Sequence, residues 1–353
     1  MKQLEGFDIE RFRNDLIQWY TINKRDLPWR KTKDPYRIWV SEIMLQQTKV
    51  DTVIPYYQAF MRKFPTQEAL AAADEEDVLK MWEGLGYYAR ARNLHAAVRE
   101  VVEHYGGVVP KSREKMLKLK GVGPYTAGAI LSIAYDLPEP AVDGNVMRVI
   151  SRLLFIEDDI GKAKTKKLFE DLLYVLICKD DPSSFNQGLM ELGALVCTPR
   201  SPGCLLCPVR EHCRAYARGL AEALPRKAKK KMPKETKIAA LIIRNDHGEI
   251  WIEKRQEKGL LAGLWQIPNV EIDDSCRLED AFLQKYKIRF QISEPIQTLQ
   301  HEFSHLIWMI TVYETQIEKA LLKENEQQRW MKREEIERFA FPVSHQKIIE
   351  HSL

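Results

Sequence analysis

The 353-residue chain lacks any run of eighteen apolar residues, which excludes a membrane-spanning helix of ordinary length. Its first residues, Met-Lys-Gln-Leu-Glu-Gly, also lack the apolar stretch of a secretory signal peptide. No internal repeat is evident. We therefore expect a cytoplasmic protein with no membrane partner, long enough for two domains.

A strong excess of one charge is missing as well. The net charge is only +4, so the overall balance is a weak argument for a polyanionic partner. The distribution is more informative, because six basic residues lie together in one short segment: Arg226, Lys227, Lys229, Lys230, Lys231 and Lys234. Such a segment is typical of a solvated linker, and its charge also suits contacts with phosphates.

Cysteine is scarce, with six in the chain, and a disulfide framework is not expected in a cytosolic protein of this size. Four of the six are close together, with the spacing Cys197-x6-Cys204-x2-Cys207-x5-Cys213. Four thiolates at this spacing are typical of one metal centre, either a tetrahedral zinc or a cubic iron–sulfur cluster. The spacing does not decide between them. Cys178 and Cys276 are interpreted as ordinary thiols.

The hydrophobic pattern divides the chain into a helical part, residues 1–222, a basic linker, 223–234, and an α/β part, 235–353. Helical patterns follow a capping Asp8 and cover 41–61, 68–82, 89–105, 112–119, 124–134, 145–155, 162–178 and 184–195. In the last part, apolar runs at 238–243 and 250–252 flank Asn-Asp-His-Gly and predict a hairpin. A further β-rich run covers 306–313.

The most informative stretch runs from Leu119 to Asp143. Gly121 and Gly123 lie between two helical patterns, where glycine lets backbone N–H groups approach a phosphate without interference from a Cβ atom. About twenty residues later, the carboxylate of Asp143 follows in a glycine-containing loop. This combination suggests chemistry on the backbone or sugar of a nucleic acid.

Several motifs, in this order, resemble those of adenine DNA glycosylases of the MutY type, in the helix-hairpin-helix superfamily of endonuclease III. The motifs are Leu27-Pro28-Trp29-Arg30, Ser41 to Thr48, Gly84 to Tyr88, the hairpin, Val142 to Asn145, Phe185-Asn186-Gln187, the cysteine set, Gly263-Leu264-Trp265, Phe303-Ser304-His305 and Phe341 to His345. They cover nearly the whole chain.

The resemblance implies a multi-domain fold, in which an all-α glycosylase domain with an iron–sulfur cluster loop precedes an α/β Nudix-like domain. It implies a [4Fe-4S] cluster on Cys197, Cys204, Cys207 and Cys213. It also implies a base excision repair enzyme that hydrolyses the N-glycosidic bond of adenine mispaired with 8-oxoguanine, or with guanine, in duplex DNA. The Nudix hydrolase signature has an Arg-Glu pair followed by a Glu-Glu pair, whereas Gly263 is followed only by Glu271, Glu279 and scattered acids, so pyrophosphate hydrolysis is not expected.

Four residues carry the chemistry that the resemblance implies. Glu42 is the general acid, with a pKa raised by apolar neighbours, and Asp143 stabilises the sugar cation. Asn145 orients Asp143 and water. Tyr125 replaces the lysine with which bifunctional relatives form a Schiff base, so strand cleavage is not expected. The alternative interpretations are a solvated helix-start glutamate, an Asp-Gly turn, a helix cap and an aromatic core residue, respectively.

The resemblance also implies the DNA contacts. Arg25, Leu27, Trp29, Arg30 and Gln187 form the adenine pocket, although Trp29 also suits a core role. The residues near 8-oxoguanine are Gln47, Thr48, Leu85, Tyr87, Phe303, Ser304 and His305, with Gln47 and Tyr87 as wedges in the base stack. Gly121 and Gly123 hold a phosphate, and the resemblance allows a monovalent cation at this hairpin.

Two other functions remain as alternatives, a bifunctional lyase like endonuclease III and a catalytically silent lesion-binding module. Tyr125 argues against the first, and Glu42 with Asp143 against the second. The partners expected are double-stranded DNA and, downstream, the enzymes that repair abasic sites. The chain is expected to act as a monomer in a bacterial-type cytoplasm, associated with DNA.

Overall fold

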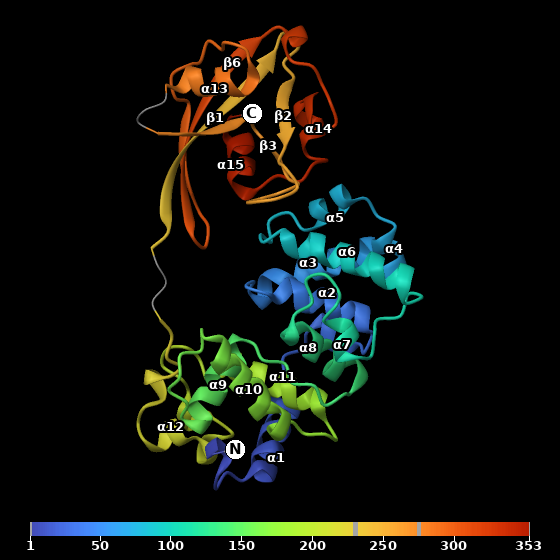
Figure 1. Cartoon of the computed structure of the whole chain (residues 1–353), viewed down its shortest axis with the longest axis vertical. Helices are drawn as coiled ribbons and strands as arrows, with labels where there is room; N and C mark the ends of the chain where they lie inside the picture. Colours follow the sequence, from blue (N-terminus) through green and yellow to red (C-terminus); the bar gives the residue numbers. More distant parts are fainter. Residues whose placement is uncertain (1, 229–231, 274–276, 353) are drawn as a thin grey trace. The chain divides into compact units, whose positions relative to one another are not determined.

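The computed structural model describes residues 2–228, 232–273 and 277–352, and it divides into two compact units (Figure 1). One unit joins residues 1–72 with 93–229, and the other joins 73–92 with 230–353. The sequence-based division did not group residues 73–92 with the C-terminal residues. Its domain boundaries stay a prediction. Lys229, Lys230 and Lys231 of the predicted linker, and Cys276, lie outside the described residues.

The described part of residues 1–229 is helical, as predicted. Its helices are α1 (Ile9–Asn23), α2 (Pro35–Leu45), α3 (Val50–Lys63), α4 (Gln67–Ala71), α5 (Glu75–Met81), α6 (Ala89–His104), α7 (Arg113–Met116), α8 (Pro124–Tyr135), α9 (Gly144–Leu154), α10 (Ala163–Leu176), α11 (Pro182–Leu195) and α12 (Arg214–Ala217). Short 3₁₀ turns lie between several of them, including one at Pro28–Lys31.

Two of the predicted helices are each broken in the structure. The pattern over 41–61 is interrupted between α2 and α3, where Gln47 has a φ of 59°, a left-handed conformation that no helix can contain. The pattern over 68–82 ends at Ala71 and resumes at Glu75. The prediction of one helix in each place was wrong because apolar spacing alone does not register a short break.

The core of the first unit surrounds α9. Val146, Val149, Ile150 and Leu153 on this helix are buried against apolar residues of α1, α10 and α11. Asp8 caps α1 as predicted, by accepting a hydrogen bond from the backbone N–H of Arg11 at 3.0 Å. Because Asp143 is the N-cap of α9, this packing fixes the position of its carboxylate.

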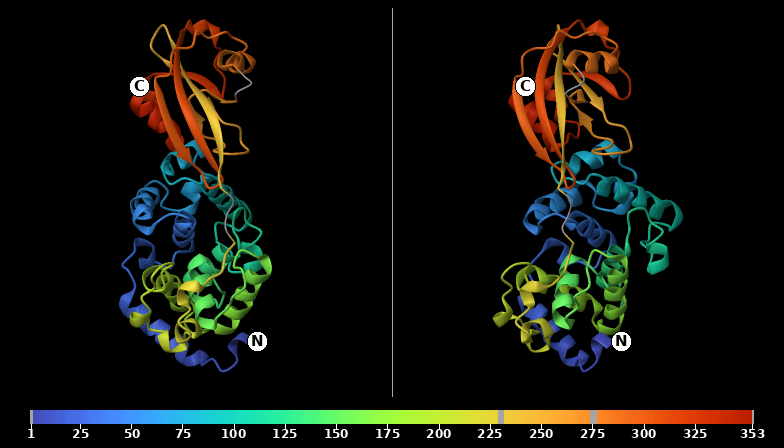
Figure 2. Two further views of the ribbon diagram at one scale, coloured as in Figure 1. Left: turned by 90° about the vertical axis from the view of Figure 1, so that its left-hand side faces the viewer. Right: turned by 60° about the vertical axis from the view of Figure 1, so that its left-hand side comes forward.

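The second unit contains a mixed sheet. Among the described residues its strands are β1 (Lys234–Asn245), β2 (Ile250–Lys254), β3 (Trp265–Gln266), β4 (Asn269–Ile272), β5 (Gln297–Glu302), β6 (Leu306–Ile317) and β7 (Gln328–Met331). The order is β3-β2-β1-β6-β5, with β4 also paired to β1 and β7 to β2. The predicted hairpin joins β1 to β2, and β1 runs parallel to β6 from Lys234↔Leu306 to Asn245↔Ile317 (Figure 2).

The apolar run of β1 is continuous because both of its faces are buried. Ile238, Ala240 and Ile242 belong to the core that contains Ile348 of α15 (Val343–Ser352). The alternate residues of β1 pack with Phe282 of α13 (Leu278–Tyr286). The sheet is therefore covered by helices on both sides, as two-sided apolar strands require. The short helix α14 (Arg333–Ile336) follows β7. No helix in the described ranges is long and apolar enough to cross a membrane.

Candidate active site

The side chain of Glu42 lies in the last turn of α2 and is 5% exposed. Asp34 begins this helix by accepting a hydrogen bond from the Tyr36 N–H at 2.9 Å, and Pro35 suits its first position. Burial raises the pKa of Glu42 to about 7, and the nearby charge of Asp143 adds to the shift. The alternative of a solvated glutamate at a helix start is therefore wrong.

Tyr125 contacts Glu42 directly. Its hydroxyl donates a hydrogen bond of 2.5 Å to Oε2 of Glu42, which opposes the rise in the carboxyl pKa. Burial raises the pKa of the Tyr125 hydroxyl well above its ordinary value, so the group stays a neutral donor. Tyr125 is the second residue of α8, directly after the turn that contains Gly121 and Gly123.

Asp143 is the N-cap of α9, where its carboxylate accepts a 2.7 Å hydrogen bond from the Val146 N–H. Asn145 donates a second hydrogen bond to it at 3.1 Å and accepts one from Arg148 at 2.8 Å. Burial raises the pKa of Asp143, and these donors oppose the shift. The cap of this helix is Asp143, so the alternative of Asn145 as the cap is wrong.

The two carboxyl groups share one cavity of about 170 Å³. The same cavity is lined by the five residues predicted to form the adenine pocket, Arg25, Leu27, Trp29, Arg30 and Gln187, and by Tyr125, Asn145 and Thr48. Trp29 also packs edge-on against Tyr57, with ring centroids 5.4 Å apart, so it belongs to the core and to the cavity. Gln187 donates hydrogen bonds to Ser183.

Among the residues of this cavity that sequence reasoning missed, Glu191 is the charged one. Its side chain is 1% exposed and accepts paired hydrogen bonds from Arg25, at 2.9 and 2.7 Å, and from Arg30, at 3.0 and 2.9 Å. Despite burial, the two guanidinium groups lower the pKa of Glu191 to about 2. The sequence did contain a signal, because Glu191 follows Gln187 by four residues and therefore lies on the same face of α11.

The helix-hairpin-helix turn needs its first glycine. Gly121 has a φ of +76°, and a Cβ atom there would lie 2.6 Å from Cβ of Asn93. Gly123 caps α8 with extended backbone. Gln47, predicted to be a wedge, also has left-handed backbone, which is uncommon for a residue with a side chain and is often retained at functional sites.

The other predicted wedge, Tyr87, also has left-handed backbone, with a φ of 49°. In the second unit its hydroxyl shares a 3.0 Å hydrogen bond with Oγ of Ser304. The guanidinium of Arg90 lies over the rings of Tyr87 and Trp82 and donates to the carbonyl of Gly86 at 3.1 Å. The loop that presents Tyr87 is thus held from within its own unit.

Phe303, Ser304 and His305 form the turn between β5 and β6. The N–H of Phe303 bonds to the carbonyl of Leu306 at 2.7 Å, and the Phe303 ring contacts Trp308. Leu85, also predicted near 8-oxoguanine, is buried in the second unit, whereas Thr48 lines the cavity of Glu42 in the first. The structure therefore brings Ser304 and Tyr87 together.

The four clustered cysteines line one small cavity together with Arg152. Arg152 donates to Sγ of Cys197 at 3.2 Å and to the carbonyl of Thr198 at 2.8 Å. In the described ranges, no three Cys, His, Asp or Glu side chains group as ligands of one metal ion. Cys178 packs at the edge of the core, as an ordinary thiol does.

Comparison with known proteins identifies both parts of the chain. The HhH-GPD superfamily of base excision DNA repair proteins matches residues 40–174, and the NUDIX domain matches residues 239–351. The chain is 38% identical to an adenine DNA glycosylase of Rattus norvegicus over 368 residues, covering 88% of this chain and 71% of the rat protein. The chain belongs to the adenine DNA glycosylase family.

Solved structures agree with this family assignment. A thermostable thymine-DNA glycosylase is 31% identical, with a TM-score of 0.53, over 60% of this chain and 97% of that one. Endonuclease III in a non-covalent DNA complex has the same fold, at 24% identity and a TM-score of 0.51, over 60% and 98% of the two chains.

Membership of the adenine DNA glycosylase family makes the protein a DNA glycosylase, a hydrolase of base excision repair. The predicted family and fold class are confirmed, with a helical helix-hairpin-helix domain followed by a Nudix-like domain of mixed sheet. In this adenine DNA glycosylase family member, Glu42, Tyr125 and Asp143 all lie in the part matched by the HhH-GPD superfamily, and Ser304 lies in the part matched by the NUDIX domain.

Proposed function

We propose that the protein removes adenine that is mispaired with 8-oxoguanine in duplex DNA. One observation carries this proposal: Glu42, with a pKa near 7, and Asp143, held as an acceptor of two hydrogen bonds, line the same cavity. Two carboxyl groups with different environments are what glycosidic bond hydrolysis requires. Adenine reaches them only after it leaves the base stack.

In the proposed reaction, neutral Glu42 donates its proton to nitrogen-7 of adenine, and the bond between the sugar C1′ and the base nitrogen breaks. The electron pair leaves with the base, and the ionised carboxylate of Asp143 stabilises the cationic sugar. A water molecule then adds to C1′ and returns a proton to Glu42. The 3.1 Å hydrogen bond from Asn145 supports its proposed role as a donor that orients Asp143, and the lining of this cavity supports the proposed roles of the pocket residues.

Tyr125 supports hydrolysis without strand cleavage, because a phenol in contact with Glu42 cannot form a Schiff base. Borohydride trapping on abasic DNA tests this point, and efficient covalent trapping would favour a bifunctional lyase. The silent lesion-binding alternative predicts no product at all from a mispaired duplex with excess enzyme.

We further propose that Tyr87, Ser304 and the adjoining Phe303 and His305 recognise 8-oxoguanine. The support is the 3.0 Å contact between the Tyr87 and Ser304 hydroxyls, which groups two of the predicted recognition residues. Gln47, Thr48 and Leu85 are proposed to contact the DNA nearby, and Gly121 and Gly123 a phosphate.

We also propose a [4Fe-4S] cluster held by the four cysteines. The four thiols line one cavity, and a four-iron cluster binds one thiolate per iron. The cation of Arg152 beside Cys197 suits an anionic cluster. A monovalent cation at the hairpin, a monomeric state, downstream abasic-site enzymes as partners and a cytoplasmic location stay predictions from the sequence.

The experiment that tests the proposed function is single-turnover adenine release, with excess enzyme, from duplexes with adenine opposite 8-oxoguanine, guanine, cytosine or thymine. We expect the fastest release opposite 8-oxoguanine and slower release opposite guanine. Equal rates on all four duplexes would contradict the proposed specificity, and no release from any of them would contradict the proposed reaction.

A further inference from the structure

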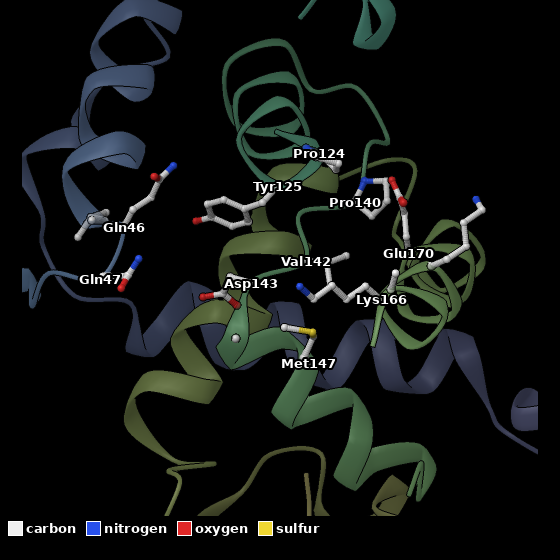
Figure 3. Close-up of a pocket in the computed structure, with 14 residues that line it drawn as sticks. Gln46, Gln47, Pro124, Tyr125, Pro140, Val142, Asp143, Met147, Lys166 and Glu170 are labelled. Atoms are coloured by element: carbon white, nitrogen blue, oxygen red, sulfur yellow. The ribbon is translucent and has the colours of Figure 1, made fainter. Parts of the chain in front are cut away.

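A second and larger cavity adjoins the candidate active site in the first unit. Its volume is about 710 Å³, and it shares Leu45, Tyr125 and Asp143 with the smaller cavity that contains Glu42. Figure 3 shows Asp143 and Tyr125 at one side of this cavity, with Lys166 and Glu170 of α10 contributing from the other. Asp143 therefore faces two spaces, of which only the smaller one is used by the proposed chemistry.

The charged side chains of the larger cavity differ in their pairing. Lys167 forms a 3.0 Å ion pair with Asp171, and Glu170 is paired with Arg113. The side chain of Lys166 forms neither a hydrogen bond nor an ion pair within the described part of the chain, whereas its backbone N–H bonds to the carbonyl of Lys162 at 3.1 Å. In Figure 3 its side chain points into the cavity, towards the side on which Asp143 lies. The cavity thus contains an exposed ammonium group that forms no ion pair with a carboxylate of the described residues, although Asp143 and Glu170 line the same cavity.

The path of the DNA strand indicates which group would lie beside the Lys166 ammonium. If adenine occupies the smaller cavity and its sugar lies at Asp143, the phosphates on either side of that sugar must lie outside the smaller cavity. The larger cavity is the adjoining space bounded by Asp143. We propose that Lys166 binds a backbone phosphate next to the extruded nucleotide. This inference rests on the proposed function and adds a binding residue to it.

The chemistry of the two groups fits. An ammonium on a flexible stem makes charge-assisted hydrogen bonds to phosphate oxygens, and the contact releases condensed counterions from the DNA. A phosphate held at Lys166 fixes one end of the sugar while the base is held in the other cavity. Lys166 then acts as a positioning residue, since it touches the backbone and not the bond that breaks.

Lys164 provides a matched control. It is exposed on the same helix, carries the same charge and does not line either cavity. The proteins compared are wild type, Lys166→Ala, Lys166→Arg and Lys164→Ala, and equal melting temperatures verify their folding. The probe is a duplex with a tetrahydrofuran abasic-site analogue opposite 8-oxoguanine, titrated at several KCl concentrations.

We expect Lys166→Ala to weaken binding roughly three- to tenfold and to lower the slope of log K against log salt by about 1. Lys166→Arg should restore most of the affinity, because it restores the charge. Lys164→Ala should change the slope by less than half as much. Equal effects of Lys166→Ala and Lys164→Ala on affinity would overturn the proposal, because both would then reflect only the loss of one positive charge from the protein surface.

A chemical double-mutant cycle localises the contact. A neutral methylphosphonate replaces, one at a time, the two phosphates that flank the abasic analogue. At one of these positions it should weaken binding by wild type several-fold and by Lys166→Ala hardly at all. Equal losses for both proteins at both positions would overturn the proposal.

These binding measurements separate the two hypotheses. Adenine release by wild type tests the proposed function, whereas the cycle uses a duplex from which nothing is released. Normal adenine release, with effects of Lys166→Ala and of the methylphosphonate on binding that simply add, would contradict only the role of Lys166. If the two effects on binding are not additive and wild type releases no adenine, the phosphate contact is supported and the proposed reaction is contradicted.

Discussion

The Tyr125 hydroxyl donates a 2.5 Å hydrogen bond to Oε2 of Glu42, and both residues border the cavity that contains Asp143. The bond favours the carboxylate form of Glu42, while burial favours the neutral form more strongly, and the pKa settles at about 7. A carboxylic acid with this pKa is partly protonated at neutral pH, as a general acid must be.

Glu42→Gln should abolish most adenine release. The amide has nearly the shape of the acid but has no proton to give, so the single-turnover rate should fall by about 10²–10⁴. Binding to DNA with adenine opposite 8-oxoguanine should be unchanged, because the other contacts remain. Release at the wild-type rate would exclude Glu42 as the acid.

Glu191→Gln should destabilise the first unit. The substitution leaves Arg25 and Arg30 beside a neutral amide, and removing one partner of a buried pair is expected to lower the free energy of unfolding by about 3 kcal/mol. Urea unfolding at pH 7 measures this. Asp171→Asn, which breaks the exposed pair with Lys167, is the control, with an expected change below about 0.5 kcal/mol.

The same carboxylate predicts a pH dependence of stability. The folded-state pKa of Glu191 is about 2, below its ordinary 4.5, so the stabilisation is present above pH 4.5 and is lost as the pH falls towards 2. Wild type should lose more stability over that window than Glu191→Gln does. If the free energy of unfolding falls equally in wild type and Glu191→Gln over this pH range, the lowered pKa of Glu191 is contradicted.

Ser304→Ala should narrow the preference for adenine opposite 8-oxoguanine over adenine opposite guanine. One hydrogen bond is involved, so a change of up to about tenfold in the rate ratio is expected. Tyr87→Phe should act in the same direction, and the double variant should show less than the product of the two effects. Thr298→Ala, exposed on the neighbouring strand β5, is the control and should leave the ratio unchanged.

Cys207→Ser should abolish the brown colour expected of the purified protein, with its broad absorption near about 400 nm. Iron content should fall from about four atoms per chain. Cys178→Ser is the control, since Cys178 packs against the same core as Cys207 but does not line the cavity of the four thiols. A colourless wild-type protein that contains zinc and is fully active would contradict the cluster.

Local patterns predicted the elements well and their interruptions poorly. The cap at Asp8, the hairpin of β1 and β2 and the long strand β6 all depend on neighbouring residues, and each was found. The break at Gln47 depends on left-handed backbone that no apolar spacing reveals. Motif resemblance supplied Arg25 and Arg30 for the cavity. The spacing of Glu191 from Gln187 places it on the same helix face, but its pairing with both arginines, across more than 160 residues, depends on how the helices pack.

The pH dependence of single-turnover adenine release tests the central claim most directly, in wild type and in Tyr125→Phe. The rate should fall as the pH rises through about 7, because Glu42 then loses its proton. Without the Tyr125 hydroxyl, whose hydrogen bond lowers the Glu42 pKa, that fall should move to higher pH. A rate that stays constant from pH 6 to 9, or a fall that does not move in Tyr125→Phe, would contradict the account.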